Sequence, residues 1–203
     1  MKHLYILLLF SLIVAATATP WTYGVTSNPP IHWVSLVDDP LAVDVSSDLG
    51  DDSDVQLNVT FGFDFTFYGI PVDSSLWVLD SNGYISFNGT TSESFQATCP
   101  FPTDPGNFAA RAFAFYWTDW DFDIGIASKA LYRFFQPGSC PYPPKQSEGC
   151  LLVDYENATD NDGFVIGNVN AFVFTSGVMV GQAQILGPYF GEPSENDGAV
   201  FGT

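Results

Sequence analysis

Apolar and polar residues alternate most clearly in residues 61–68, where Phe occupies every second position. This is the period of a β-strand with one buried face. A short apolar run follows at residues 76–79, and residues 84–87 return after Asn82-Gly83, a dipeptide typical of β-hairpin turns. The pattern therefore predicts three successive antiparallel strands within residues 61–88.

Extended patterns recur along the rest of the chain, at residues 111–117, 130–135, 150–155, 171–175 and 178–185. The last two flank Ser176-Gly177 and predict a second hairpin. No segment of ten or more residues has the period of an amphipathic helix. Short strands between turns rich in Gly and Pro predict an all-β fold, an antiparallel β-sandwich with long irregular loops. We expect residues 19–55 to form an irregular N-terminal arm, followed by the sandwich domain over residues 56–203.

The segment from Phe113 to Asp123 has to change its direction. If it stayed extended, the aromatic face that begins at Phe113 would continue into the core with three carboxylates, those of Asp119, Asp121 and Asp123. Burying three carboxylates without partners would cost too much free energy. We therefore expect the strand to end, bulge or emerge near Thr118. Trp120 and Phe122 would then point inward.

The N-terminus has the three parts of a secretory signal peptide. Lys2 and His3 precede an apolar run over residues 4–16, and small residues then fit a cleavage site after Ala18. The run is shorter than the roughly 20 residues that a membrane-spanning helix needs. We expect residues 1–18 to be a signal peptide, and the mature chain to be secreted or to lie at the cell surface without membrane insertion.

The charge of the chain excludes two classes of partner. The sequence has 23 Asp and Glu against five Lys and Arg, for a formal net charge of −18. Nucleic acids and anionic lipids both need a basic surface, so we predict neither as a partner. The surplus of carboxylates favours cations instead. The acidic run over residues 44–54 lacks the full pattern of an EF-hand loop, and we expect it to be a solvated loop.

Three cysteines are present, Cys99, Cys140 and Cys150, and in a secreted chain they should be oxidised. Cys140 and Cys150 bracket a Pro-rich loop, so we predict a disulfide between them, worth about 3 kcal/mol in the chain-entropy model. Cys99 would then be free, paired between chains, or paired with a group outside this sequence. Pairing of Cys99 with Cys140 or Cys150 is the alternative. The spacing does not fit a zinc site.

Four motifs in order resemble the nidogen-like extracellular β-domains. The first two are Phe-Thr-Phe-Tyr-Gly at residues 65–69 and Leu-Trp-Val-Leu-Asp-Ser-Asn-Gly-Tyr-Ile-Ser-Phe at residues 76–87. Residues 112–123 and Ala-Leu-Tyr-Arg at residues 130–133 are similar to the next two. The resemblance covers roughly residues 56–200. It implies a secreted or cell-surface module, usually carried within larger proteins, with no catalytic activity of its own.

The end of the chain departs from this pattern. Residues 198–203 resemble the start of a final strand that then stops. We therefore expect a nidogen-like β-sandwich domain over residues 56–203 that is truncated at its C-terminus or lacks its partner module.

Asp119, Asp121 and Asp123 are the candidate metal ligands. They offer hard oxygen atoms at alternate positions where a strand meets a loop. A bound calcium ion would neutralise carboxylates that otherwise repel one another. The alternative is that all three face water. No other cofactor is expected.

Three asparagines begin Asn-X-Thr glycosylation sequons, namely Asn58, Asn88 and Asn157. Asn88 follows a strand at a turn and Asn157 lies in a polar loop, so we expect both to be exposed. Asn58 is nearer to the Phe-rich strand. In a eukaryote we expect at least one of them to carry a glycan, whereas in many bacteria such sequons occur by chance.

The sequence favours a secreted or cell-surface, non-catalytic binding or adhesion module, stabilised by calcium, whose partner is an extracellular protein or glycan. Tyr116, Trp117 and Trp120 belong either to a sugar-binding surface or, the reading we favour, to the core. His32 is the only histidine of the mature chain, and nothing near it indicates an activated nucleophile. Two alternatives stay open: a secreted, glycosidase-like hydrolase with paired carboxylates, and a purely structural component of the extracellular matrix.

Overall fold

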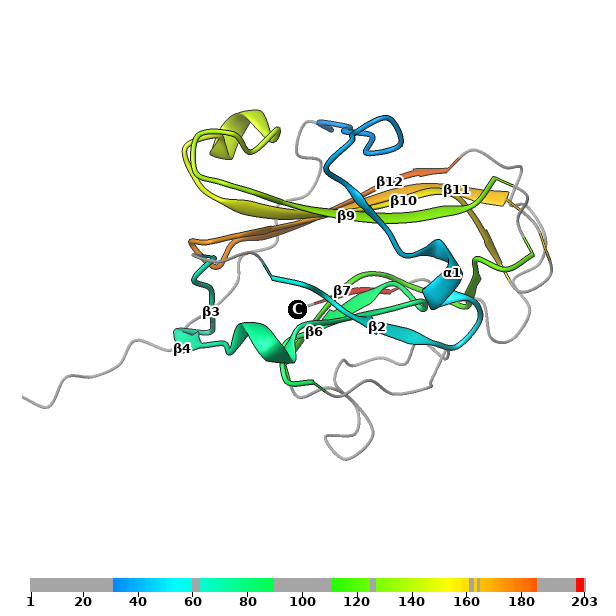
Figure 1. The fold of residues 1–203 in the computed structure, drawn as a ribbon, viewed down its shortest axis with the longest axis horizontal. Helices are drawn as coiled ribbons and strands as arrows, with labels where there is room; N and C mark the ends of the chain where they lie inside the picture. Colours follow the sequence, from blue (N-terminus) through cyan, green and yellow to red (C-terminus); the bar gives the residue numbers. More distant parts are fainter. Residues whose placement is uncertain are drawn as a thin grey trace, which may run out of the picture.

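Two antiparallel β-sheets lie face to face in the structure, a computed structural model that describes residues 31–59, 63–89, 111–124, 127–160, 163, 165–185 and 200–202 (Figure 1). The six-stranded sheet runs in the order β1 (Val43–Asp44), β9 (Lys129–Phe135), β10 (Cys150–Asp160), β11 (Val165–Phe174) and β12 (Met179–Ile185), with β8 (Trp120–Asp121) also paired to β10. The five-stranded sheet runs in the order β13 (Val200–Gly202), β7 (Ala112–Trp117), β6 (Tyr84–Ser86), β5 (Val78–Asp80) and β2 (Asp54–Gln56). The predicted all-β sandwich is confirmed.

The remaining elements of the described chain are short. They are the two-stranded ribbon of β3 (Thr66–Phe67) and β4 (Ile70–Pro71), the helix α1 (Ser46–Leu49), and the 3-10 turns η1 (Ser74–Leu76) and η2 (Pro143–Lys145). None of the described helices is long and apolar enough to cross a membrane. The segment expected to be an irregular arm contributes β1 to one sheet and β2 to the other.

Rigid aromatic side chains fill much of the space between the sheets. Phe115 of β7 and Phe122 both pack edge-to-face against Tyr155 of β10, with ring centroids 5.3 and 4.7 Å apart. At the other end, Trp77 packs against Phe87 at 4.8 Å. All five side chains are buried in one continuous core. Such edge-to-face pairs add stability beyond the apolar area that they bury.

The Phe-rich segment differs from the predicted strand. In its described part only Thr66–Phe67 is strand, although Phe65 and Phe67 are buried as the alternation indicates. Both rings contact Phe87, at 4.9 and 5.4 Å between centroids. Tyr68 then takes a left-handed backbone conformation, with φ +49°, and reverses the chain into β4. Ring packing therefore holds this segment more than a hydrogen-bonded ladder does.

The predicted hairpin at Asn82-Gly83 is confirmed, with Asp80 paired to Tyr84 across a three-residue loop. Gly83 has φ +82°, a conformation that glycine adopts without steric cost. A Cβ atom at Gly83 would lie 1.9 Å from the backbone oxygen of Tyr116. The turn therefore packs directly against the end of β7.

The chain passes from one sheet to the other just after β7. β7 belongs to the five-stranded sheet, while β8, three residues later, pairs with β10 of the six-stranded sheet. The N–H of Thr118 between them donates to the backbone oxygen of Asn82. Trp120 and Phe122 are buried in the shared core, as predicted from the cost of burying the acidic residues.

A second apolar cluster covers the outer face of the six-stranded sheet. Residues 31–36 cross this face, and the loop closed by a disulfide between Cys140 and Cys150 packs beside them. Tyr142 of this loop contacts Phe172 and Phe174 of β11, with ring centroids 5.1 and 5.5 Å apart. The expected signal peptide and Cys99 lie outside the described residues.

Candidate metal centre

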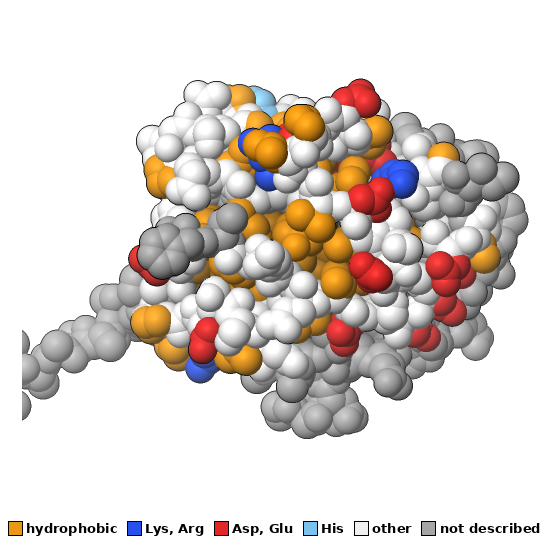
Figure 2. Space-filling model, viewed as in Figure 1, with side chains coloured by type: hydrophobic (Ala, Val, Ile, Leu, Met, Phe, Trp, Pro, Cys, Tyr) orange, Lys and Arg blue, Asp and Glu red, His pale blue; other side chains and the backbone are white. Residues whose placement is uncertain are grey.

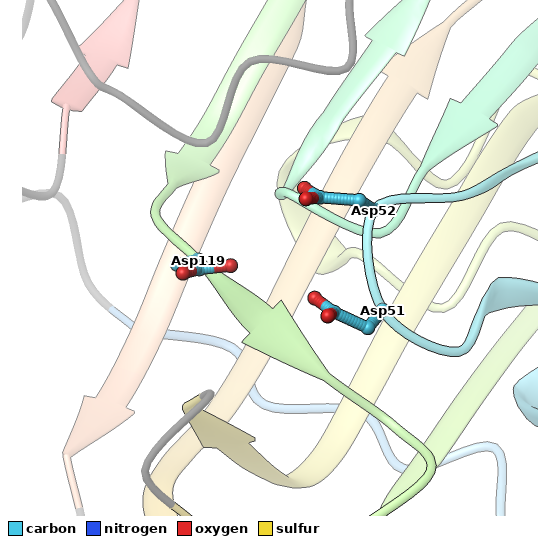
Figure 3. A group of neighbouring side chains, drawn as sticks. All are labelled: Asp51, Asp52 and Asp119. Atoms are coloured by element: carbon cyan, nitrogen blue, oxygen red, sulfur yellow. The ribbon is translucent and has the colours of Figure 1, made fainter.

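Three carboxylates from two distant segments converge beside α1. Asp51 and Asp52 follow α1 in the chain, and Asp119 lies at the break between β7 and β8. One oxygen from each lies within 4.8 Å of the others. Figure 3 shows the side chains of Asp51 and Asp52 reaching from their loop toward Asp119.

The loop that carries Asp51 and Asp52 is fixed against the strand break. Asp51 forms an isolated β-bridge with Asp121, and the N–H of Phe122 donates to the backbone oxygen of Gly50 at 3.3 Å. A Cβ atom at Gly50 would lie 2.6 Å from a carboxylate oxygen of Asp123. Gly50 therefore permits the close approach of the two segments.

A buried amide completes this group of oxygen atoms. The side chain of Asn82 is fully buried, and its Nδ2 donates to Oδ1 of Asp52 at 2.9 Å. Its Oδ1 has no hydrogen-bond partner among the described residues. A buried polar atom without a partner is costly. An amide that rotates by half a turn exchanges its oxygen and nitrogen, so Asn82 could present its oxygen to a cation held by Asp52.

Only one of the three Asp residues predicted from the sequence as metal ligands belongs to the converging group. Asp119 joins the cluster, whereas Asp121 is buried and its Oδ1 accepts the N–H of Asp123 at 2.7 Å. Asp123 is exposed and faces Gly50. The reason is that β8 pairs with β10, so the alternate positions no longer share a single surface.

Negative charge accumulates around the cluster. Burial raises the pKa of Asp51, and the nearby carboxylates of Asp52, Asp121 and Asp123 raise it further. Burial also raises the pKa of Asp80 to about 7. Lys129, Arg133 and Lys145, the basic side chains in ion pairs within the described parts, bind other carboxylates. Figure 2 shows several acidic side chains at the α1 end of this face. A cation would reduce this repulsion.

Sequence reasoning missed Asp51 and Asp52. They lie in the acidic run that was expected only to be solvated, and both are indeed exposed. The pairing of β2 with β5 places the loop of Asp51 and Asp52 beside the turn at Asn82, and therefore near Asp119. The sequence predicted the turn at Asn82-Gly83, but it did not indicate that Asp52 would lie beside Asn82.

The three sequons lie in different environments. Asn58 is exposed, and Asn88 is half-buried with its Oδ1 accepting from Ser86 Oγ at 2.8 Å. Asn157 lies within β10, where a bulge gives it φ +49°, rather than in a polar loop, and it is half-buried like Asn88 instead of exposed as expected. The hydroxyl of Thr159 in the same sequon is buried and donates to the backbone oxygen of Asp121. Glycosylation of these sites stays a prediction.

The aromatic residues near the strand break belong to the core in so far as they are described. Trp120 is fully buried and its indole N–H donates to the backbone oxygen of Tyr116 at 3.1 Å. A sugar therefore has no access to the face of Trp120, and Tyr116 is only half-exposed. The side chain of Trp117 lies outside the described part of the chain.

Apolar side chains are also exposed along the side of the sandwich, between the two layers (Figure 2). A groove of about 400 Å³ is lined there by Leu41, Val43, Asn58 and the end of β9. Leu41 and Val43 are both largely exposed. This groove lies apart from the acidic cluster, and its lining residues include no carboxylate.

More than half of the chain matches the model of a known protein family. A family model described as NIDO related matches residues 25–138, which is more than half of the chain. The match begins within the N-terminal segment that we expected to be an irregular arm. No curated protein and no solved structure matches the chain.

Proposed function

The chain belongs to the NIDO-related family, and from this premise we propose that it is a secreted or cell-surface, non-catalytic binding or adhesion module stabilised by calcium. Family membership indicates an extracellular domain, and the absence of catalysis in this proposal follows the resemblance to nidogen-like domains. The partner is an extracellular protein or glycan. The exposed apolar groove beside β9 favours a protein contact.

The convergence of Asp51, Asp52 and Asp119 is the observation that carries the calcium proposal. One oxygen atom from each lies within 4.8 Å of the others, although Asp119 is far from Asp51 and Asp52 in sequence. The cluster offers only oxygen, the ligand type of hard divalent cations. Calcium accepts six to eight oxygen ligands in flexible geometry, so three carboxylates, the amide oxygen of Asn82 and water would suffice.

A calcium ion at this position would connect the α1–β2 loop to the point where the chain crosses between the sheets. Asp51 and Asp52 belong to the loop, and Asp119 belongs to the crossing. The ion would therefore hold the loops at this end of the sandwich in one arrangement. Fixed loops at one end of a sandwich provide a preorganised surface for a partner.

Isothermal titration of the mature, oxidised protein with calcium tests this proposal. We expect one site with a Kd of about 10⁻⁴ to 10⁻³ M, the range of extracellular calcium modules. The change Asp119→Asn removes a ligand charge and should weaken binding at least about tenfold. Asp64→Asn is the matched control, because Asp64 is an exposed carboxylate outside the cluster, and it should bind as the wild type does.

The same titration separates the two arrangements of ligands. Asp123→Asn should weaken binding less than Asp119→Asn does, since Asp123 is not among the three converging side chains. If Asp123→Asn abolished binding and Asp119→Asn did not, the assigned ligands would be incorrect. A wild-type protein without measurable calcium binding would overturn the calcium proposal altogether.

A further inference from the structure

Residues 31–36 are held to the outer face of the six-stranded sheet by one row of polar side chains. Asp154, Asn170 and Gln182 lie opposite one another on the neighbouring strands β10, β11 and β12. The row therefore crosses the sheet at right angles to its strands. All three side chains are buried, which is unusual for such polar groups unless they have partners.

The partners of this row are backbone N–H groups of alternate residues within residues 31–36, the described start of the N-terminal arm. His32 donates to Gln182 Oε1 at 2.7 Å, and Val34 donates to Asn170 Oδ1 at 3.1 Å. Leu36 donates to Asp154 Oδ2 at 2.7 Å. The side chain of Leu36 is buried in the apolar cluster below. Leu36 and Asp154 are thus the deepest contact between the arm and the sheet.

Asp154 shares this buried position with a second carboxyl group. Glu156 lies two residues further along β10, so both side chains point to the same face. Asp154 is fully buried and Glu156 nearly so. The negative charge of Glu156 on the same face disfavours the ionised form of the buried Asp154.

In the described parts of the chain, no basic side chain forms an ion pair with Asp154 or Glu156. On β9, Lys129 lies opposite Glu156 but its Nζ binds Asp44 at 2.7 Å, and Arg133 forms an ion pair with Asp39. The neighbours on β11 and β12 are the neutral side chains Asn168, Asn170, Gln182 and Gln184. In the arm, the ring of His32 packs against Tyr142. Asp38, the next acidic residue of the chain, is exposed.

A proton on Asp154 favours the docked arm. Burial raises the pKa of Asp154 to about 8, and the adjacent Glu156 adds to this, although the N–H of Leu36 and the amide of Asn170 favour the ionised form. Burial therefore prevails over the hydrogen bonds. Because the arm covers Asp154, its displacement would expose the carboxyl to water and lower the pKa toward its ordinary value of about 3.9.

We propose that the arm is a proton-controlled latch, closed over the sheet when the buried Asp154 holds a proton and loosened when Asp154 loses it. The sign follows from linkage, since the docked state binds the proton more tightly than the open state. Opening becomes easier as the pH rises from about 4 to about 8, and it changes little at higher pH. Release would uncover the apolar side chains beneath Leu36, among them Leu131, Leu152 and Phe172.

Hydrogen exchange of the mature protein, measured by mass spectrometry between pH 5 and 9, tests this latch. Each exchange rate is divided by that of the unfolded chain at the same pH, so that only the opening equilibrium remains. We expect opening of the arm, reported by peptides over residues 32–36, to increase up to about tenfold per pH unit between pH 5 and 8. Peptides over β11 should stay protected throughout.

Two substitutions distinguish the latch from general effects of pH. Asp154→Asn keeps the size and an acceptor for Leu36, and it should make arm exchange independent of pH. Glu156→Gln removes the neighbouring charge and should move the rise in exchange to lower pH by about one unit. Asp38→Asn, at an exposed carboxylate next to the arm, should behave as the wild type does.

Three results would overturn the latch. They are an arm whose protection does not change between pH 5 and 8, a variant Asp154→Asn that keeps the full pH dependence, and β11 peptides that lose protection in parallel with the arm. If Asp154→Asn fails to fold, an unchanged profile in Glu156→Gln would overturn it equally. These outcomes are independent of whether calcium binds at the other end of the sandwich.

Discussion

At the scale of single residues, the cost of burying charge explains the chain near the strand break. The argument that three carboxylates could not follow the Phe113 face into the core predicted that Trp120 and Phe122 would point inward, and both are buried. The same argument could not say where the carboxylates would go. Asp119 meets Asp51 and Asp52 because of pairings between strands that are distant in sequence. Local patterns carry no information on such pairings.

Gly83 gives a prediction at this scale. The change Gly83→Ala places a Cβ atom 1.9 Å from the backbone oxygen of Tyr116, at a residue with φ +82°. Both the left-handed conformation and the contact oppose any side chain, so we expect a loss of about 2 kcal/mol or more in the free energy of unfolding. Urea denaturation measures it.

Gly138 is the matched control for this substitution. It also has a positive φ, of +87°, but a Cβ atom there would meet nothing within 4 Å. Gly138→Ala should therefore cost only the backbone strain, about 1 kcal/mol. Equal losses for the two variants would show that the contact with Tyr116 does not matter.

At the scale of elements, the strands with a clear turn or a continuous apolar run could be predicted. These are the hairpin β5–β6, the strands β7, β9 and β12, the first half of β10 and the end of β11. The Phe-rich segment differs because its rings find partners in Trp77 and Phe87 rather than on a neighbouring strand. The short strands β1 and β2 have no pattern of their own, and their place in the sheets depends on tertiary contacts.

The loop closed by Cys140 and Cys150 gives a prediction at the scale of elements. The disulfide holds Tyr142 over Phe172 and Phe174, so it stabilises the second apolar cluster as well as closing the loop. The double substitution Cys140→Ala and Cys150→Ala should lower the free energy of unfolding by about 3 kcal/mol. Chemical denaturation measures this loss, and reduction of the wild type should reproduce it. A double variant as stable as the wild type would show that the disulfide contributes nothing.

At the scale of the whole molecule, the sequence indicated an acidic, extracellular β-sandwich, and the fold and the family agree with this. The net charge of −18 by itself predicts only that cations are attracted. The structure adds two separate places where carboxyl groups are crowded. One is the cluster beside α1, which we assign to calcium, and the other lies beneath the arm, where we assign a proton to the buried Asp154 beside Glu156.

The central claim is that calcium stabilises this module through Asp51, Asp52 and Asp119. Its most direct test is thermal unfolding of the mature, oxidised protein with calcium and with a chelator, at fixed ionic strength and pH. One site at about 100 times its Kd should add about 2.7 kcal/mol, which corresponds to a rise in Tm of roughly 5 to 10 °C for a chain of this size. The rise should disappear in Asp119→Asn and persist in Asp64→Asn. An equal Tm with calcium and with chelator, or a rise that survives in Asp119→Asn, would contradict the account.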